Sequence, residues 1–215
     1  HSKLPQARVH ALWTLHGLGA LSEERIAEAL ADKDARVVEN ALALADPKRD
    51  RAALLALAQA GRERASFLAV LALGDDAGDD VTEAFATLLY NTPARMDPWM
   101  RKAVLSGSKE RAGIILGELL KRRRGPQVGT GFQNQASYED CLREFSAAVA
   151  ARGDVAELAA VLDQANHPEA GHGDRARFAF AVGLANGLKR SKLKQKSLAA
   201  LIASPPEELK DKVAG

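Results

Sequence analysis

The chain has 215 residues, 47% apolar and 27% charged, which is the balance of a folded protein rather than a disordered one. Its net charge of +2 is too small to imply a polyanionic partner by itself. A single cysteine, Cys141, excludes an intrachain disulfide, a thiolate zinc cluster and a CxxCH haem attachment within this sequence. The sequence contains no run of 18 apolar residues, so it predicts no membrane span. The abundance of alanine and leucine favours helices.

A sequence phrase returns about every 30 residues in the first half of the chain. Its copies lie at 8–15, 37–44, 65–73 and 99–105, and each has an alanine near its middle: Ala11, Ala41, Ala69 and Ala103. The spacings between these alanines are 30, 28 and 34 residues. A period in this range predicts stacked helical repeats. We therefore predict an all-α fold, a right-handed α-solenoid (α-α superhelix) of helix pairs.

The first pair is expected at 5–17 and 22–31, separated by a glycine-containing break. Ser22 supplies the cap of the second helix. In the first helix Val9, Leu12, Trp13 and His16 share one face, a stripe wider than a surface helix needs. We expect this helix to be covered by its partner and by repeats on both sides.

Capping residues mark the expected starts of helices in the next pairs. The second repeat starts near Asp34, and its partner helix follows Asp46-Pro47, which we interpret as an N-cap and a first-turn proline. Helices at 62–73 and 81–90 form the third pair. The fourth starts after Asp97-Pro98, and its partner spans 109–123.

The repeat pattern is no longer clear after residue 123. We predict a glycine-rich loop at 124–136, then helices at 137–151, 154–165, 174–188, 191–203 and 206–213, the last with a capping box that starts at Ser204. In the first of these helices one apolar face carries Tyr138, Cys141, Leu142, Phe145 and Val149. We expect clear repeats over 5–123 and degenerate ones over 137–215, within a single repeat domain covering 1–215. Because the chain opens on His1 without methionine or a signal-like core, we expect a piece of a longer protein.

Positive charge gathers in the second half. Residues 1–90 hold 10 Lys and Arg against 14 Asp and Glu, whereas residues 91–215 hold 20 against 14. The excess lies in two clusters, Lys121, Arg122, Arg123 and Arg124, and Lys189, Arg190, Lys192, Lys194 and Lys196. They are either a solvated face with cations at helix C-termini, or a surface for phosphate or an acidic partner.

The sequence contains no strong motif for catalysis, nucleotide binding or metal binding. Gly129-Thr130-Gly131 lacks the third glycine and the preceding strand of a nucleotide fingerprint, and His167 and His172 lie in a glycine-containing loop without a fourth metal ligand. We interpret Cys141 as a buried structural residue. No GxSxG or HExxH motif is present. We therefore predict neither a catalytic site nor a cofactor or metal site here.

One cluster brings an acid, an aromatic ring and a base together: Asp97, Trp99 and Arg101. We interpret it as a capped helix start with a tryptophan in the core. The alternative is a lesion-binding site on a helical stack.

The repeats resemble short HEAT repeats, of the roughly 30-residue kind also found in relatives of bilin lyases. The stretches 7–21, ARVHALWTLHGLGAL, and 97–106, DPWMRKAVLS, are more specific. Both resemble the HEAT region of large secreted proteins of planctomycete-type bacteria, which lies between a sugar-dehydrogenase-like β-propeller and a c-type cytochrome domain. The resemblance covers residues 5–120 clearly. It implies a spacer or docking role in a periplasmic or extracellular redox protein, with haem c elsewhere in that protein.

Two functions follow as hypotheses. The first is a non-catalytic, monomeric scaffold that binds a protein or neighbouring domains of its own chain, through the concave face that second helices form in such arrays. The second is a protein similar to HEAT-like alkylpurine DNA glycosylases, or another nucleic-acid binder, which would use Asp97, Trp99, Arg101 and the cluster 121–124. The acidic first half counts against a full-length groove for nucleic acid, so we favour the scaffold.

Overall fold

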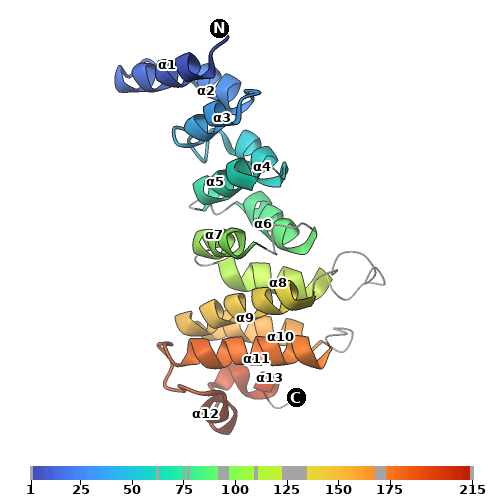
Figure 1. The fold of residues 1–215 in the computed structure, drawn as a ribbon. Helices are drawn as coiled ribbons and strands as arrows, with labels where there is room; N and C mark the ends of the chain where they lie inside the picture. Colours follow the sequence, from blue (N-terminus) through green and yellow to red (C-terminus); the bar gives the residue numbers. More distant parts are fainter. Residues whose placement is uncertain are drawn as a thin grey trace. The chain divides into compact units, whose positions relative to one another are not determined.

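The structure is a computed structural model that describes residues 2–61, 63–74, 76, 78–91, 97–108, 111–122, 135–167 and 173–213. These residues form thirteen α-helices and the 3-10 helix η3, with no β-strand among them, which confirms the all-α prediction. Two compact units, His1–Ala84 and Phe85–Gly215, divide the chain within α6 (Asp79–Asn91). Figure 1 labels the helices of both units. The hand of the superhelix and a single domain over the whole chain stay predictions.

The N-terminal unit contains α1 (Pro5–Gly17), α2 (Glu23–Leu30), α3 (Ala35–Leu42), α4 (Arg51–Gln59), α5 (Glu63–Leu73) and the first residues of α6. α3 packs against both α1 and α5, while α4 packs on α5. Ser22 and Asp34 accept hydrogen bonds from the backbone N–H of Arg25 and Arg36, so the predicted starts of α2 and α3 are confirmed.

The marker alanines lie where helices pack closely, with one exception. Ala41 and Ala69 are fully buried and Ala103 nearly so, but Ala11 is exposed. In α1 only Leu12 is buried, and the Trp13 side chain is 44% exposed. The prediction that α1 is covered on both sides is wrong for the described residues, because α1 has a stacked first helix, α3, on one side only.

Asp46 caps a turn rather than the predicted helix. Its carboxylate accepts from the backbone N–H groups of Lys48 and Arg49, both at 2.9 Å. The helix itself, α4, begins at Arg51 with Asp50 as N-cap, four residues later than the cap signal implied. Asp46-Pro47 therefore marks a local turn that does not continue into α4.

The C-terminal unit continues from α6 with α7 (Pro98–Ser108), α8 (Ala112–Arg122), α9 (Gln135–Arg152), α10 (Val155–Ala165), α11 (Asp174–Leu188), α12 (Leu198–Ala203), η3 (Glu207–Leu209) and α13 (Lys210–Val213). Its helices form two rows. In one row α9 packs against α7 and α11, and in the other α10 packs against α8, η3 and α13. The helix-pair pattern of the clear repeats therefore continues beyond residue 137.

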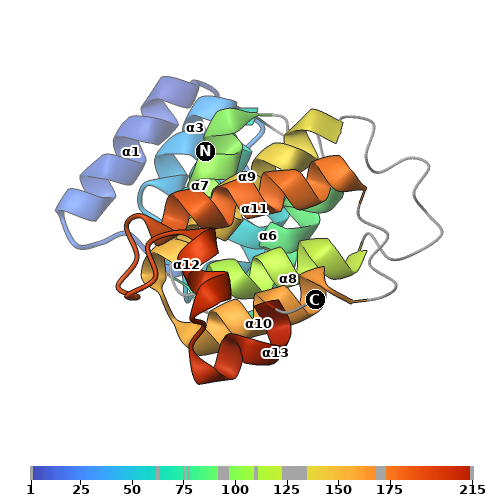
Figure 2. The ribbon, with the colours of Figure 1, turned by 90° about the horizontal axis from the view of Figure 1, so that it is seen from below.

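α9 and α11 make the most extensive contact among the described helices of this unit, and Figure 2 shows them side by side. The predicted stripe of α9 is confirmed: Tyr138, Cys141, Leu142, Phe145 and Val149 are all buried. On α11, Gly183 lies against the Ser146 hydroxyl and the Arg143 carbonyl, while Gly187 lies against the Ala147 carbonyl. Glycine one turn apart lets the two backbones approach, because a β-carbon at either position would overlap the neighbouring helix.

Two predicted helices near the C-terminus are shorter than expected. Of the span 191–203 only Leu198–Ala203 is helical, since the preceding stretch has a single apolar residue, Leu193, and no stripe to bury. Ser204 ends α12 instead of capping the next helix. The last segment is η3 followed by α13, and the predicted capping box is absent there.

Candidate functional site

A groove of about 1040 Å³ lies between α8 and α10 in the C-terminal unit. We call it the α8–α10 groove. Its apolar lining comes from small residues and one isoleucine: Gly113, Ile114, Gly117, Ala151 and Ala160. Its charged lining comes from both ends of these helices and from neighbouring segments: Glu118, Lys121, Arg152, Asp154, Glu157 and Lys192.

Glycine in α8 opens the floor of the groove. A β-carbon added at Gly117 would have the Gln164 Cγ atom, 3.8 Å away, as its nearest neighbour, so the position is uncrowded. Beside it the Ile114 side chain is 59% exposed. The floor therefore offers an accessible apolar surface between two charged ends.

Glu157 holds the start of the groove together. The sequence Asp154-x-x-Glu157 has the spacing of a capping box, and Asp154 does accept from the Glu157 backbone N–H at 2.9 Å. The Glu157 carboxylate reaches elsewhere, accepting from the Gly113 backbone N–H of α8 at 2.8 Å and from Arg152 Nε at 3.0 Å. Burial raises the pKa of Glu157, against the opposing effect of Arg152 and of the Gly113 N–H. Glu157 thus links three helices and is not a free base.

A cationic segment borders the same end of the groove. We call residues 189–196 the basic loop, because Lys189, Arg190, Lys192, Lys194 and Lys196 are all exposed along it. The loop is fixed by Ser191, which is buried and accepts from the Leu193 backbone N–H. Ser191 and Leu193 pack against Gly153. This contact requires glycine, because the residue has a φ of +68° and a side chain would overlap Ser191. Lys192 and Arg152 both line the groove.

The structure brings together part of the predicted cationic surface. Lys121 and Lys192, from the two separate clusters, line the same groove. Arg122 turns away from it, donating to Thr87 Oγ1 at 3.0 Å and lying over the Tyr90 ring. Lys189 and Arg190 lie on the basic loop outside the lining, whereas Arg123 and Arg124 lie outside the described residues.

The cluster of Asp97, Trp99 and Arg101 does not converge. Asp97 accepts from the Trp99 backbone N–H at 2.8 Å, so it does cap the helix as predicted. The Trp99 side chain is 70% exposed, with Lys102 Nζ 5.5 Å from its ring centre, so the prediction of a core tryptophan is wrong. Arg101 is buried and faces Asp140 and Glu144 of α9 at 3.4 and 3.3 Å. Met100, Ala103 and Val104 fill the buried face of α7, and Trp99 falls outside it.

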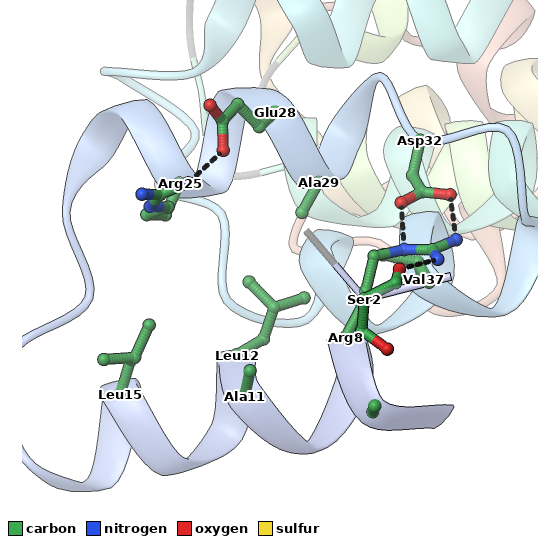
Figure 3. Close-up of a pocket in the computed structure, with 11 residues that line it drawn as sticks. Ser2, Arg8, Ala11, Leu12, Leu15, Arg25, Glu28, Ala29, Asp32 and Val37 are labelled. Carbon is green, nitrogen blue, oxygen red and sulfur yellow. Dashed lines mark hydrogen bonds and ion pairs between the residues drawn. The ribbon is translucent and has the colours of Figure 1, made fainter. Parts of the chain in front are cut away.

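A second cavity, of about 330 Å³, lies between α1 and α2 in the N-terminal unit. Figure 3 shows Arg8 joined to Asp32 by two hydrogen bonds, which measure 2.7 and 2.9 Å, while Leu12 and Leu15 line the cavity further along α1. The Arg8 guanidinium holds the pKa of Asp32 below its usual range. Both charges are engaged with each other, so this cavity offers a ligand mainly apolar contacts.

Sequence reasoning did not find the role of Glu157 or the glycines of α8. The signals were present as the Asp154-x-x-Glu157 spacing and the Gly113-x-x-x-Gly117 spacing. Neither identifies its partner helix, because Glu157 and Gly113 are 44 residues apart.

Two further sequence expectations concern metals and membranes. Among the described residues no group of three or more His, Cys, Asp and Glu could hold a metal ion. The loop that carries His172 lies outside those residues. None of the helices that the structure describes has the length and apolar character needed to cross a bilayer.

Comparison with protein-family models, with curated proteins and with solved structures found no match to this chain.

Proposed function

We propose that this chain is a non-catalytic helical-repeat scaffold that binds protein. The observation that carries the proposal is the α8–α10 groove, an open channel with an apolar floor and charged ends formed by stacked helices. Repeat arrays present extended surfaces of this kind to linear partners. The right-handed superhelix, a role between redox modules and a location outside the cytoplasm belong to the same proposal and depend on the HEAT resemblance.

The charges in the groove support binding rather than turnover. Arg152 pairs with Glu157, and Lys121 pairs with Glu118 at 2.9 Å. Asp154 is engaged as the cap of α10. A catalytic site needs a base or nucleophile held ready beside an electrophile-stabilising group. The described lining residues instead neutralise one another, except for Lys192, which is exposed and has no carboxylate partner among the described residues.

A selection experiment tests the scaffold. A random peptide library displayed on phage is panned against the whole immobilised chain, and selected peptides are measured in solution. We expect enrichment of a shared sequence pattern with micromolar or tighter affinity. No enrichment above an unrelated helical protein, or robust sugar-dehydrogenase activity with an artificial electron acceptor, would refute the proposal.

Nucleic-acid binding is the second candidate, because Trp99 is exposed and Lys102 lies over its ring. An exposed aromatic ring beside a cation can stack on an unpaired base. Titration of intact and alkylated duplex DNA into the chain at two salt concentrations tests it. Binding that weakens steeply with salt and is lost in Trp99→Ala would support this candidate; no binding at low salt would remove it.

A further inference from the structure

Unpaired positive charge borders the α8–α10 groove at the basic loop, whereas the groove lining itself holds three acidic and three basic side chains. Between residues 175 and 206 the sequence has seven Lys and Arg and no Asp or Glu. Within the described part of the chain, Arg190, Lys192 and Lys194 have no carboxylate partner. The acidic residues in the groove are already engaged, as described above. An occupant therefore encounters Lys192 as the unpaired charge of the lining, and a carboxylate at Lys121 competes with Glu118 for an exposed pair that contributes little stability.

The two lysines of the lining stand at opposite ends. Lys192 is held near the start of α10, because its loop packs on Gly153. Lys121 lies eight residues along α8 from Gly113, a distance of about 12 Å at 1.5 Å per residue. An extended chain covers that length in about four residues. Ile114 and Ala160 provide the apolar surface between the ends.

We infer that the groove binds a linear acidic peptide segment, with one carboxylate near Lys192, another near Lys121 and an apolar side chain over Ile114. The inference rests on the proposed protein-binding function and adds the chemistry of the partner. Charge-assisted hydrogen bonds at the two ends fix the register, while the apolar contact contributes affinity.

A peptide fits this surface better than a nucleic-acid backbone does. None of the described residues that line the groove is aromatic, so bases find no ring to stack on. Glu118 and Asp154 lie along the path and would repel an uninterrupted row of phosphates. A peptide can place its two carboxylates at the ends and keep neutral residues beside these acids.

Fluorescence anisotropy on the whole chain tests the inference. The probe is a short fluorescein-labelled peptide with two glutamates four positions apart and leucine between them, and its matched control carries glutamine instead. We expect the glutamate peptide to bind and the glutamine peptide to bind about tenfold more weakly. Lys121→Glu/Lys192→Glu should weaken binding at least tenfold. Lys33→Glu/Lys48→Glu, which makes the same charge change at exposed lysines of the N-terminal unit, should change it less than twofold.

Ile114→Ser separates the groove from general positive charge. The variant leaves the charge unchanged and replaces an exposed side chain, so the fold is retained, and we expect binding to weaken about three- to fivefold. Equal binding by the two lysine double variants, or no effect of Ile114→Ser, would overturn the groove as the site. Tighter binding of a single-stranded oligonucleotide than of the peptide, dependent on the same lysines, would overturn the peptide assignment. If phage selection yields peptides whose binding ignores these substitutions, the scaffold proposal stands and this inference fails.

Discussion

The N-terminal unit ties helices to distant turns with arginine–aspartate pairs, whereas the C-terminal unit brings two helix backbones into contact through glycine. In the first, Arg8 pairs with Asp32 and Arg51 with Asp76, and each aspartate also accepts a backbone N–H two residues further on. In the second, Gly183 of α11 lies against the backbone of α9. The arginine–aspartate contacts therefore depend on charge, and the α9–α11 contact depends on steric fit.

This difference determines which changes each unit tolerates. A side-chain pair between partly exposed groups contributes modestly, weakens with salt and responds to pH. A backbone contact between long helices, here of 18 and 15 residues, has no flexible part that can move aside. We expect the α9–α11 contact to be the more sensitive to a single added methyl group, and the arginine–aspartate contacts to be the more sensitive to acid.

Among the substitutions that add atoms to a packed site, Gly183→Ala should have the largest effect. The new β-carbon would overlap the Ser146 hydroxyl and the Arg143 carbonyl, and we expect a loss of about 3 kcal/mol in the free energy of unfolding. Urea denaturation followed by circular dichroism measures it. Gly117→Ala is the matched control, because its β-carbon has room and alanine favours helix by about 1 kcal/mol over glycine. Similar stabilities of the two variants would contradict steric control of the α9–α11 contact.

Ala41→Leu asks the same question of the N-terminal unit. Ala41 is fully buried on α3, so overpacking should lower the free energy of unfolding by about 1–3 kcal/mol. Ala11→Leu at the exposed marker position should change it by less than about 0.5 kcal/mol. Thermal unfolding of both variants measures the difference. An unchanged melting temperature for Ala41→Leu would show that the repeat register is wrong.

Lowering the pH should change the stability contributions of Asp34 and Glu157 in opposite directions. Arg36 lowers the pKa of Asp34 from 3.8 to about 2, so its stabilising contribution is complete above about pH 4 and is lost as pH falls toward 2. Burial raises the pKa of Glu157 above its usual 4.5, so its contribution is present below that pH and is lost as pH rises through the raised value. Melting temperatures measure both effects between pH 2 and 7.

The variants Asp34→Asn and Glu157→Gln isolate these two contributions. Relative to the parent chain, Asp34→Asn keeps a capping side chain and should melt a few degrees lower at pH 7, with the difference closing in acid. The melting temperature of Glu157→Gln relative to the parent should instead rise with pH. Parallel pH profiles for the two variants would contradict the opposite shifts.

A smaller effect than that of the core substitutions is expected for Trp99→Ala. An exposed tryptophan gives up little buried surface, so we expect a loss below about 1 kcal/mol, compared with about 3–5 kcal/mol for a core tryptophan. Chemical denaturation measures it, with Phe145→Ala as the buried aromatic control. A loss equal to that of the control would place Trp99 in a packed environment.

Local signals in the sequence predicted much of the fold. Ser22 and Asp34 act on backbone groups within three residues, and the stripe of α9 repeats within one helix, so each could be read without knowing the tertiary structure. The prediction that Trp13 and Trp99 are buried was wrong. Each follows or precedes a buried residue by one position, which places its side chain about 100° away around the helix. Of the candidate site, the cations were visible in the sequence. Their meeting in one groove was not, since it depends on which helices pack together.

The reach of Glu157 has a consequence for the order in which this unit folds. In a simple repeat array each helix pair is completed by its neighbours in sequence, and unfolding can proceed stepwise from an end. The Glu157 carboxylate caps the first turn of α8 from 44 residues away, and the same group is held by the last residue of α9. The first turn of α8 is therefore completed only after α10 has folded against it. Hydrogen exchange at Gly113 should report the opening of α8, α9 and α10 as one cooperative event.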